Sequence, residues 1–347
     1  MAQVTKKLYY WIRDRMNICA EEQVPKLSIV ICTYRRPDHL ARLLGALQKQ
    51  TVPAGDFETI VVDNDPEPNI EVQELCRPEN FQGANIRYIH HARLGISSAR
   101  NRGVNEARAG WVGFLDDDVL PPPGWVSKVL TSQGISQAMI LGGPFKPFYT
   151  STPPRWFKDI YATQYFGDQA HWMKMNKYLA GANMIWSREL ILRLGGFSEK
   201  FGFIGSKQVY CDDTELGQRA FLEGIGSWYD PALEILHHFD ARRMSVRWFL
   251  GTIIRHSQVK ARLVLRETNL VDKRPIIRQV LSVLKKLFIH KVYFLNSCWM
   301  ALFWKRKEYP YLENYIIEVI GGEIRQVILN LEMIWLLIFE PYKAPIT

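Results

Sequence analysis

The sequence predicts an α/β protein with a mostly parallel sheet, helices on both faces of that sheet, and a C-terminal helical extension. In the first third of the chain, short apolar runs alternate with helical patterns. The runs are β-branched and continuously apolar, which is typical of parallel strands buried on both faces. Beyond residue 240 this alternation gives way to long helical patterns, with apolar stretches at 276–304 and 311–340.

The expected elements follow one another as strand, helix and strand. We expect helices after Pro37-Asp38 and over 95–108, and strands at 27–32, 58–63, 86–91 and 111–115. Such alternation builds a parallel sheet, and ligands of such sheets bind at the carboxyl ends of the strands. We expect residues 124–240 to continue the domain with a mixture of helices and strands.

Composition excludes several classes of protein. The five cysteines are scattered and form no CxxC pair, so neither a zinc site nor a disulfide framework is indicated. The first thirty residues are basic and aromatic without a long apolar segment, which argues against secretion. We therefore expect a cytoplasmic location.

The positive charge is concentrated in one segment. Residues 241–307 contain 16 Lys and Arg and only two acids, a net charge of +14 in a chain of net charge +9. The apolar stretch Val292 to Trp304 lies between cations and is shorter than the ~20 residues of a spanning helix. We expect this segment to lie on an anionic membrane surface, peripherally. Alternatively, its helices bury their apolar faces against the rest of the chain or a second subunit.

The sharpest chemical signal is the triple Asp116-Asp117-Asp118, directly after the apolar run 111–115. Three adjacent carboxylates are costly unless a cation lies among them. Hard oxygen ligands suit Mg²⁺ or Mn²⁺, which in turn hold a diphosphate. An acidic surface turn or helix cap is the alternative, but the position at the ligand edge of the sheet favours a metal.

Polar residues follow the other expected strands as well. Thr33-Tyr34 comes after the first strand and Asp63 ends the second; each also suits an ordinary turn. Arg100 lies in the segment 94–103, where Gly95 permits close backbone approach. Arg100 suits either a phosphate or an Arg–Asp salt bridge that holds the fold, and both roles stay open.

Several motifs in order resemble the family 2 glycosyltransferases of GT-A fold. The motifs are Ser28-Ile-Val-Ile-Cys-Thr-Tyr-Arg-Arg36, Ile60-Val-Val-Asp-Asn64, Gly95-xxx-Ala-Arg-Asn-x-Gly103, Phe114-Leu-Asp-Asp-Asp118, Gly195-Gly-Phe-Ser-Glu-Lys-Phe201 and Cys211-Asp-Asp-Thr-Glu-Leu-Gly-Gln-Arg219. The resemblance covers about residues 26–245.

The resemblance implies roles for individual residues. Thr33 and Asp63 would contact the nucleotide base, Asp118 would bind the metal, and Asp213 would be the general base. Asp212 stands where the family has Glu, which puts the acceptor geometry in doubt but not the base. The complete implied set of substrate-binding residues is Thr33, Tyr34, Arg36, Asp63, Arg100 near the diphosphate, Asp116 near the ribose, Asp117 and Asp212.

The family often has a histidine near the end of this region, and in some members it reaches the metal or the phosphates. His237 fits that spacing better than His238, and a surface turn is the alternative. Asp213 likewise has an alternative role as an acid at a helix N-terminus. Direct displacement needs a base for the acceptor proton and a cation for the departing diphosphate, so two carboxylate clusters suit this chemistry.

We therefore expect an inverting, metal-dependent glycosyltransferase that moves a sugar from a nucleotide diphosphate, a UDP-sugar, onto a glycan or lipid-linked acceptor, with Mn²⁺ or Mg²⁺ as cofactor. The expected organisation is a basic lead over 1–25, a nucleotide-sugar-binding half over 26–123, an acceptor-binding half over 124–245 and a helical basic extension over 246–347.

Two other functions are compatible with parts of the sequence. A sugar-nucleotide nucleotidyltransferase shares this type of sheet but carries a Gly-rich loop after the first strand, where this chain has Thr33-Tyr-Arg-Arg-Pro37. A non-catalytic basic protein that binds membranes or nucleic acid fits the charge, but no nucleic-acid motif accompanies it, so no nucleic-acid partner is expected. Walker and GxGxxG loops are absent.

Overall fold

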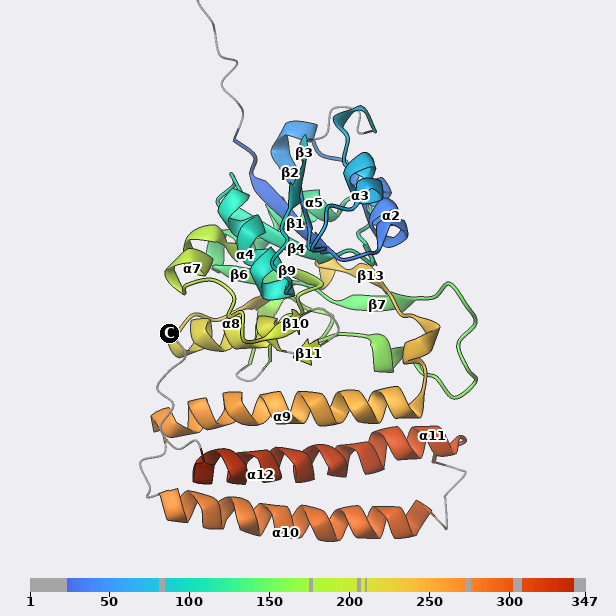
Figure 1. Cartoon of the computed structure of the whole chain (residues 1–347), viewed down its shortest axis with the longest axis vertical. Helices are drawn as coiled ribbons and strands as arrows, with labels where there is room; N and C mark the ends of the chain where they lie inside the picture. Colours follow the sequence, from blue (N-terminus) through green and yellow to red (C-terminus); the bar gives the residue numbers. More distant parts are fainter. Residues whose placement is uncertain are drawn as a thin grey trace, which may run out of the picture.

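The computed structural model describes residues 24–80, 85–174, 177–204, 207–209, 211–271, 276–301 and 308–339, so the basic lead expected over 1–25 falls almost wholly outside the described residues. At its centre is an eight-stranded sheet with the order β3-β2-β1-β4-β9-β6-β12-β8 (Figure 1). The strands are β1 (Leu27–Thr33), β2 (Phe57–Asp63), β3 (Asn85–His90), β4 (Trp111–Asp116), β6 (Ile140–Gly142), β8 (His171–Trp172), β9 (Asn183–Ser187) and β12 (Trp228–Tyr229). Strands β3, β2, β1 and β4 are parallel, and β9 is antiparallel to both of its neighbours.

The strand register brings the predicted polar positions to one edge of the sheet. In the pairing of β1 with β2, Thr33 lies beside Asp63, and Cys32 lies beside Asp116 of β4. The parallel strands therefore end level with one another. This is the physical reason that residues far apart in the sequence share one edge.

Helices cover both faces of the sheet. Along β1, Leu27, Ile29 and Ile31 pack into one core cluster and Val30 into the other, as the two-residue period of a strand requires. The first cluster is completed by α2 (Pro37–Leu47), α3 (Ile70–Leu75) and α5 (Trp125–Thr131), and the second by α4 (Ile96–Glu106), α7 (Arg188–Arg193) and α8 (Asp212–Leu222). The predicted α/β sheet with two covered faces is confirmed.

Smaller elements close the carboxyl edge of the sheet. A three-stranded sheet has the order β5-β13-β7, and β10 pairs with β11. The bounds are β5 (Val119–Leu120), β7 (Phe145–Phe148), β10 (Gly202–Ile204), β11 (Lys207–Val209), β13 (Ile235–His238), α6 (Gln133–Gln137), and the 3₁₀ turns η1 (Ala54–Asp56), η2 (Pro78–Asn80), η3 (Asp159–Ala162), η4 (Pro231–Leu233) and η5 (Ala241–Arg243).

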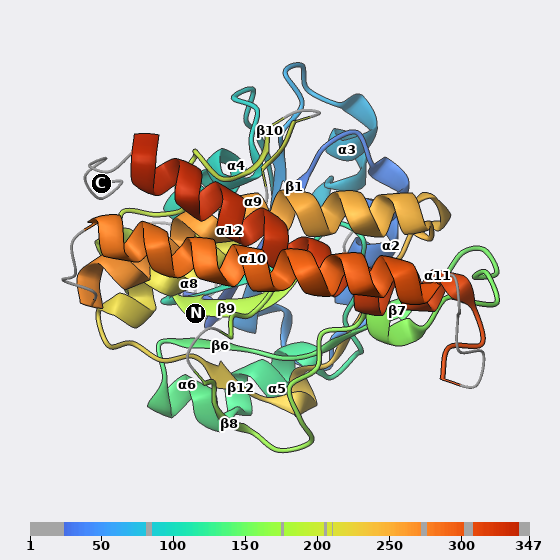
Figure 2. The same cartoon turned by 90° about the horizontal axis from the view of Figure 1, so that it is seen from below.

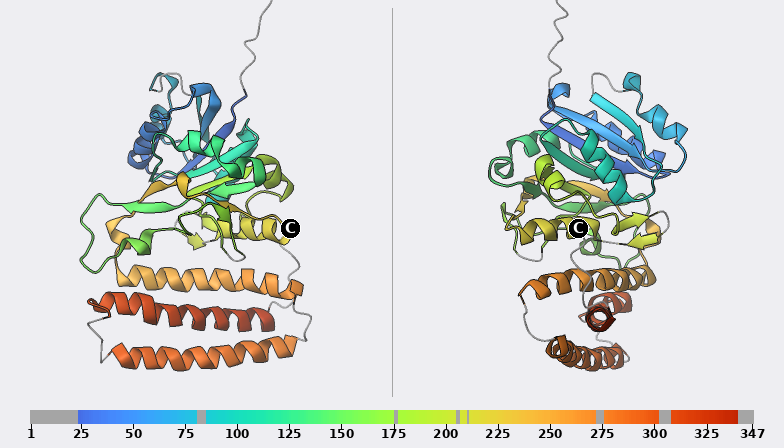
Figure 3. Two further views of the ribbon diagram at one scale, coloured as in Figure 1. Left: turned by 180° about the vertical axis from the view of Figure 1, so that it is seen from behind. Right: turned by 60° about the vertical axis from the view of Figure 1, so that its left-hand side comes forward.

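The C-terminal part is a separate layer of long helices. It contains α9 (Val246–Val271), α10 (Ile276–Ala301), α11 (Leu312–Tyr315), the π-turn η6 (Ile316–Ile320) and α12 (Gly321–Phe339). Helix α9 lies nearest the sheet, α12 next, and α10 farthest away (Figures 1 and 3). Leu265, Val283 and Met333 are among the residues of a small core in this layer. No helix in the part of the chain that the structure describes is long and apolar enough to cross a membrane.

Glycine at position 103 allows α4 to lie close against β1. A Cβ on Gly103 would overlap the side chain of Val30, whereas a Cβ on Gly45 in α2 would meet nothing within 4 Å. We expect Gly103→Ala to lower the free energy of unfolding by about 1–3 kcal/mol through overpacking. Gly45→Ala should raise it by about 0.5–1 kcal/mol through helix propensity. Urea denaturation of both variants measures this, and a shift of the same sign in both would contradict the close packing of α4.

Candidate active site

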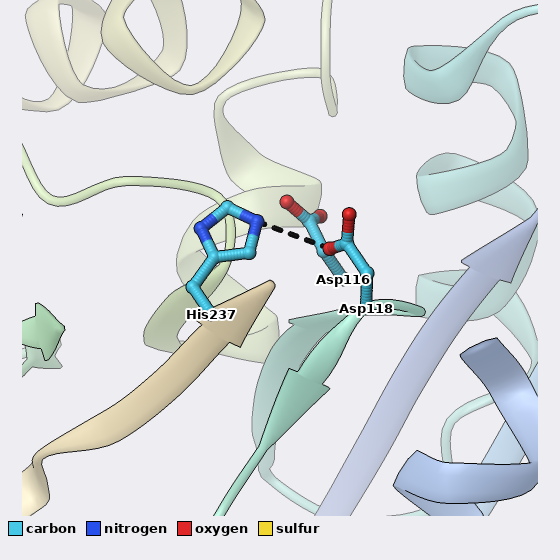
Figure 4. A group of neighbouring side chains, drawn as sticks. All are labelled: Asp116, Asp118 and His237. Atoms are coloured by element: carbon cyan, nitrogen blue, oxygen red, sulfur yellow. Dashed lines mark ion pairs between the residues drawn. The ribbon is translucent and has the colours of Figure 1, made fainter. Parts of the chain in front are cut away.

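The first cluster joins the end of β4 to β13. Pairing of β13 with β5 sets His237 opposite Val119, and the backbone N–H of His238 donates to the carbonyl of Asp118 over 2.9 Å. Nε2 of His237 consequently lies 3.0 Å from Oδ1 of Asp118. One ligand atom each of Asp116, Asp118 and His237 lie within 4.8 Å of one another, and the side chains converge (Figure 4).

This cluster has the electrostatics of a cation site. Burial disfavours the charged form of Asp118, but the hydrogen bond and charge of His237, together with the charges of Arg243 and Arg36, hold the pKa of Asp118 below its usual range. Burial also opposes protonation of His237, yet the bond to Asp118 raises the pKa of this histidine. Two carboxylates and one imidazole form a mixed oxygen and nitrogen donor set, which suits Mn²⁺ better than Mg²⁺.

The structure separates the two adjacent histidines. His237 belongs to the cluster, and the ring of Phe145 packs edge-on against its imidazole at 5.1 Å. His238 points elsewhere: its Nε2 is 3.0 Å from Oγ1 of Thr150, and its ring contacts those of His39 and Phe148. Of the two histidines, His237 is therefore the one placed to reach a metal.

Arg100 connects the aspartate triple to the second acidic pair. Its guanidinium donates to Asp212 through Nη1 and, over 3.1 Å, to Oδ1 of Asp116 through Nη2. Arg100 is 5% exposed, and the rings of Phe114 and Phe197 pack against it. The Arg–Asp salt bridge, one of the two roles that the sequence left open, is present. A phosphate contact by the same residue stays a prediction.

The second acidic pair begins α8. Cys211 precedes the helix with a left-handed backbone (φ 74°), which turns the chain into the first helical turn. Asp212 is buried beside Arg100, and burial raises the pKa of its carboxyl to about 6. Asp213 is less buried: Oδ2 accepts from the N–H of Gly181 over 2.8 Å, and Oδ1 accepts from the N–H of Thr214 over 2.6 Å. Asp213 thus accepts a free N–H in the first turn of the helix, and its carboxylate is held in one orientation.

The side chain of Asp117 does not join the cluster of Asp116, Asp118 and His237; it lies at the end of β1. Its Oδ2 accepts from the hydroxyl of Thr33 over 2.8 Å, and its Oδ1 lies 3.2 Å from Nη1 of Arg36. The same nitrogen of Arg36 lies 3.3 Å from Oδ2 of Asp118. Burial, with the charge of Asp118 beside it, raises the pKa of Asp117 to about 7. Thr33, Arg36 and Asp117 therefore form one network that supports Asp118.

Asp63 and Tyr34 border this network without joining it. Asp63 is fully buried and accepts hydrogen bonds from the N–H of Asn69 and the hydroxyl of Tyr88, each over 2.8 Å. Asp63 therefore caps the turn that follows β2. Its contact with a nucleotide base stays a prediction. Tyr34 is partly exposed, with the guanidinium of Arg35 over its ring at 5.1 Å.

Some residues of the site carried no signal in the sequence. Gly181 fixes Asp213 through its N–H, and a Cβ at Gly181 would overlap the guanidinium of Arg100. A pocket of about 270 Å³ opens beside α8 and is lined by Thr214 together with His256 and Lys260 of α9. The sequence predicts α9 as part of the extension over 246–347. The spacing of apolar residues in a helix does not show which neighbouring element the helix will contact.

Known proteins resemble this chain in sequence. Residues 28–195 match the family described as Glycosyl transferase family 2. The chain is 35% identical over 141 residues to a succinoglycan biosynthesis protein of Rhizobium meliloti, covering 40% of this chain and 45% of the relative. It is 30% identical over 234 residues to a validoxylamine A glucosyltransferase of Streptomyces hygroscopicus, covering 59% and 54%. The matched parts thus span about half the length of these relatives.

Solved structures share the fold of the chain. A mannosyltransferase of Pyrobaculum calidifontis, in complex with GDP-Man and Mn²⁺, covers 93% of this chain and 81% of its own at a TM-score of 0.54 and 16% identity. TarS of S. aureus, in complex with UDP, covers 89% of this chain and 90% of its own at a TM-score of 0.50 and 16% identity. The fold is that of the GT-A glycosyltransferases. Residues 28–195 of the chain are the region that matches glycosyl transferase family 2.

Because Arg100 neutralises Asp116 on one side and Asp212 on the other, its replacement should lower the stability of the fold. We expect Arg100→Gln to lower the free energy of unfolding by about 3–5 kcal/mol, since Asp116 and Asp212 would be left without their counter-charge. Arg193→Gln breaks an exposed pair with Glu223 and should cost less than about 1 kcal/mol.

Denaturant titration measures both variants. The deficit of Arg100→Gln should shrink as the pH falls towards about 6, the pKa of Asp212 beside Arg100, because Asp212 without this counter-charge takes up a proton at a higher pH. A deficit that is equal for the two variants, or that grows in acid, would contradict the bridging role.

Proposed function

We propose that the chain transfers a sugar, with inversion, from a UDP-sugar to a hydroxyl of a glycan or glycolipid. The observation that carries this proposal is the Asp116–Asp118–His237 cluster at the ligand edge of a family 2 sheet, which Arg100 ties to the helix bearing Asp213. The family match favours this function over the nucleotidyltransferase and the non-catalytic alternatives. The solved relatives hold GDP-Man or UDP, so a GDP-sugar is the second candidate donor.

The proposed chemistry is a direct displacement at the anomeric carbon. The acceptor oxygen forms the new bond to that carbon as the bond to the diphosphate breaks. Asp213 takes the acceptor proton; it suits this role because backbone N–H groups fix its carboxylate and leave it partly exposed. Asp118 and His237 would hold a divalent cation, Mn²⁺ or Mg²⁺, with Asp116 beside it. That cation would neutralise the charge that develops on the leaving diphosphate.

The networks around these groups orient them before the substrate arrives. Arg36 and the Thr33–Asp117 pair hold Asp118, and Phe145 holds the ring of His237. Such support keeps reacting groups in place and lowers the reorganisation needed during the reaction. The pocket lined by Thr214, His256 and Lys260 adjoins the helix that carries Asp213, and we propose this side of the site for the acceptor.

We also propose a cytoplasmic location. The described cysteines, Cys32, Cys76, Cys211 and Cys298, are all free thiols, which supports a reducing compartment. Fractionation of cells that produce the full chain tests this location.

Asp118→Asn removes one anionic ligand while keeping the shape of the side chain. We expect the Mn²⁺ concentration for half-maximal activity to rise at least by the ~10–100-fold that loss of a supporting partner costs at metal sites. Hydrolysis of UDP-sugars and GDP-sugars across a Mn²⁺ series measures this. Asp56→Asn, at a buried acid paired with Lys26, is the matched control and should keep the wild-type metal dependence. Unchanged, metal-independent activity in Asp118→Asn would refute the metal site.

Asp213→Asn should separate donor binding from turnover. We expect near-normal UDP binding with turnover reduced by at least ~10²-fold, as loss of general-base catalysis implies. The substitution also weakens the acceptor for the N–H of Thr214 in the first turn of α8, so Asp230→Asn is the control: Asp230 caps η4 through the N–H of Ala232 and lies outside the cluster. If UDP binding falls in step with turnover, Asp213 serves the donor or the fold instead.

A further inference from the structure

Helix α10 carries a row of large apolar side chains that are largely exposed in the part of the chain that the structure describes. Phe288 is 70% exposed, Trp299 61% and Leu281 60%. The full row, with members three or four residues apart, is Leu281, Leu284, Phe288, Val292, Leu295 and Trp299. That spacing places all six on one face of the helix. Soluble proteins rarely expose so continuous an apolar surface unless it is a binding surface.

This apolar row lies opposite the face by which α10 packs. Val283 belongs to the small core of the helical layer, and His290 pairs with Glu323 of α12 over 3.1 Å. By the ~3.6-residue turn of a helix, these two positions fall on the side away from the row. Helix α10 is the outermost helix of the layer (Figures 1 and 2). Because its packed side is turned toward α12, the apolar row faces away from the catalytic part of the chain.

The charges beside the row are all positive. Arg278, Lys285 and Lys291 are exposed on α10 at the flanks of the row, and residues 276–301 contain no Asp or Glu. The acids of the adjacent helix α12 are turned toward other helices. Glu323 pairs with His290, and Glu332 lies 3.8 Å from Arg262 of α9.

We propose that this face of α10 docks the protein on an anionic lipid surface, with the apolar row in the boundary between headgroups and acyl chains and the cations on the headgroups. An apolar stripe bordered by Lys and Arg is the pattern of helices that lie in a membrane interface. Long Lys and Arg side chains reach the headgroups while their stems cover apolar surface.

Association with a second copy of the chain is the competing occupant of this face. A two-fold contact between copies would bring the same surface of each together, so the lysines of one α10 would face those of the other. Like charges across an interface oppose association. A lipid surface of negative charge offers both an apolar phase and the opposite charge. The sequence places the contact broadly in 241–307, and the exposed row restricts our proposal to α10. Leu302 and Phe303, near the end of the apolar stretch Val292 to Trp304, lie outside the described residues.

Vesicle co-sedimentation of the full chain tests the proposal without depending on enzymatic activity. The wild type should sediment with vesicles of phosphatidylcholine plus phosphatidylglycerol, only weakly with phosphatidylcholine alone, and should be released as salt rises. Equal sedimentation with both vesicle types, or binding that salt does not weaken, would overturn the electrostatic part of the proposal.

Two sets of variants test the surface itself. Replacing Arg278, Lys285 and Lys291 by Gln should weaken binding to the anionic vesicles by roughly fivefold for each cation. The matched control replaces two exposed lysines elsewhere by Gln: Lys49, in the turn after α2, and Lys128 on α5. It should bind as the wild type does.

The double variant Phe288→Ser, Trp299→Ser should lose at least tenfold in binding, a rough minimum for removing two large apolar groups. Its control is Ile70→Ser, a 72% exposed apolar residue on α3. Thermal unfolding should match the wild type in all variants, because each altered side chain is exposed. Unchanged binding in the double variant would overturn the proposal, as would a wild-type dimer that this variant converts to a monomer while vesicles bind neither form.

Discussion

The guanidinium of Arg100 is the interaction on which the arrangement of the candidate site depends. It lies between Asp116 at the end of β4 and Asp212 at the start of α8, two acids almost a hundred residues apart that would otherwise repel each other in a buried setting. Desolvated carboxylates need such a counter-charge, and the aromatic rings of Phe114 and Phe197 leave water little access to it. The constraint extends to the backbone, since only glycine at 181 leaves room for Arg100.

The remaining parts of the site follow from this link. With α8 held against the end of β4, the carboxylate of Asp213 has one orientation, fixed by the N–H of Gly181. On the other side, the pairing of β5 with β13 brings His237 to Asp118. The cluster with Asp118 and the pair with Asp213 therefore lie on opposite sides of the buried guanidinium of Arg100. This is the separation that a reaction with a departing diphosphate on one side and an incoming hydroxyl on the other requires.

The helical layer is organised by a different force. Its helices bury one apolar face among themselves, in the core that includes Leu265, Val283 and Met333, yet α10 keeps a second apolar face exposed. One partner of α10, helix α12, is within the chain (Figure 2). For the other apolar side we propose an anionic lipid surface, because the charges that flank it are positive.

The sequence by itself determined the α/β class, because fully buried strands and amphipathic helices differ in the period of their apolar residues. It also determined which polar residues end the strands, since in a parallel sheet Thr33, Asp63 and Asp116 must reach the same edge. What it left open was decided by contacts between distant segments. The β5–β13 pairing selected His237 over His238, Arg100 took the salt-bridge position, and α9 placed His256 and Lys260 beside α8. Periodicity and motif spacing report on neighbours along the chain, whereas these choices rest on packing between elements that only the tertiary fold brings together.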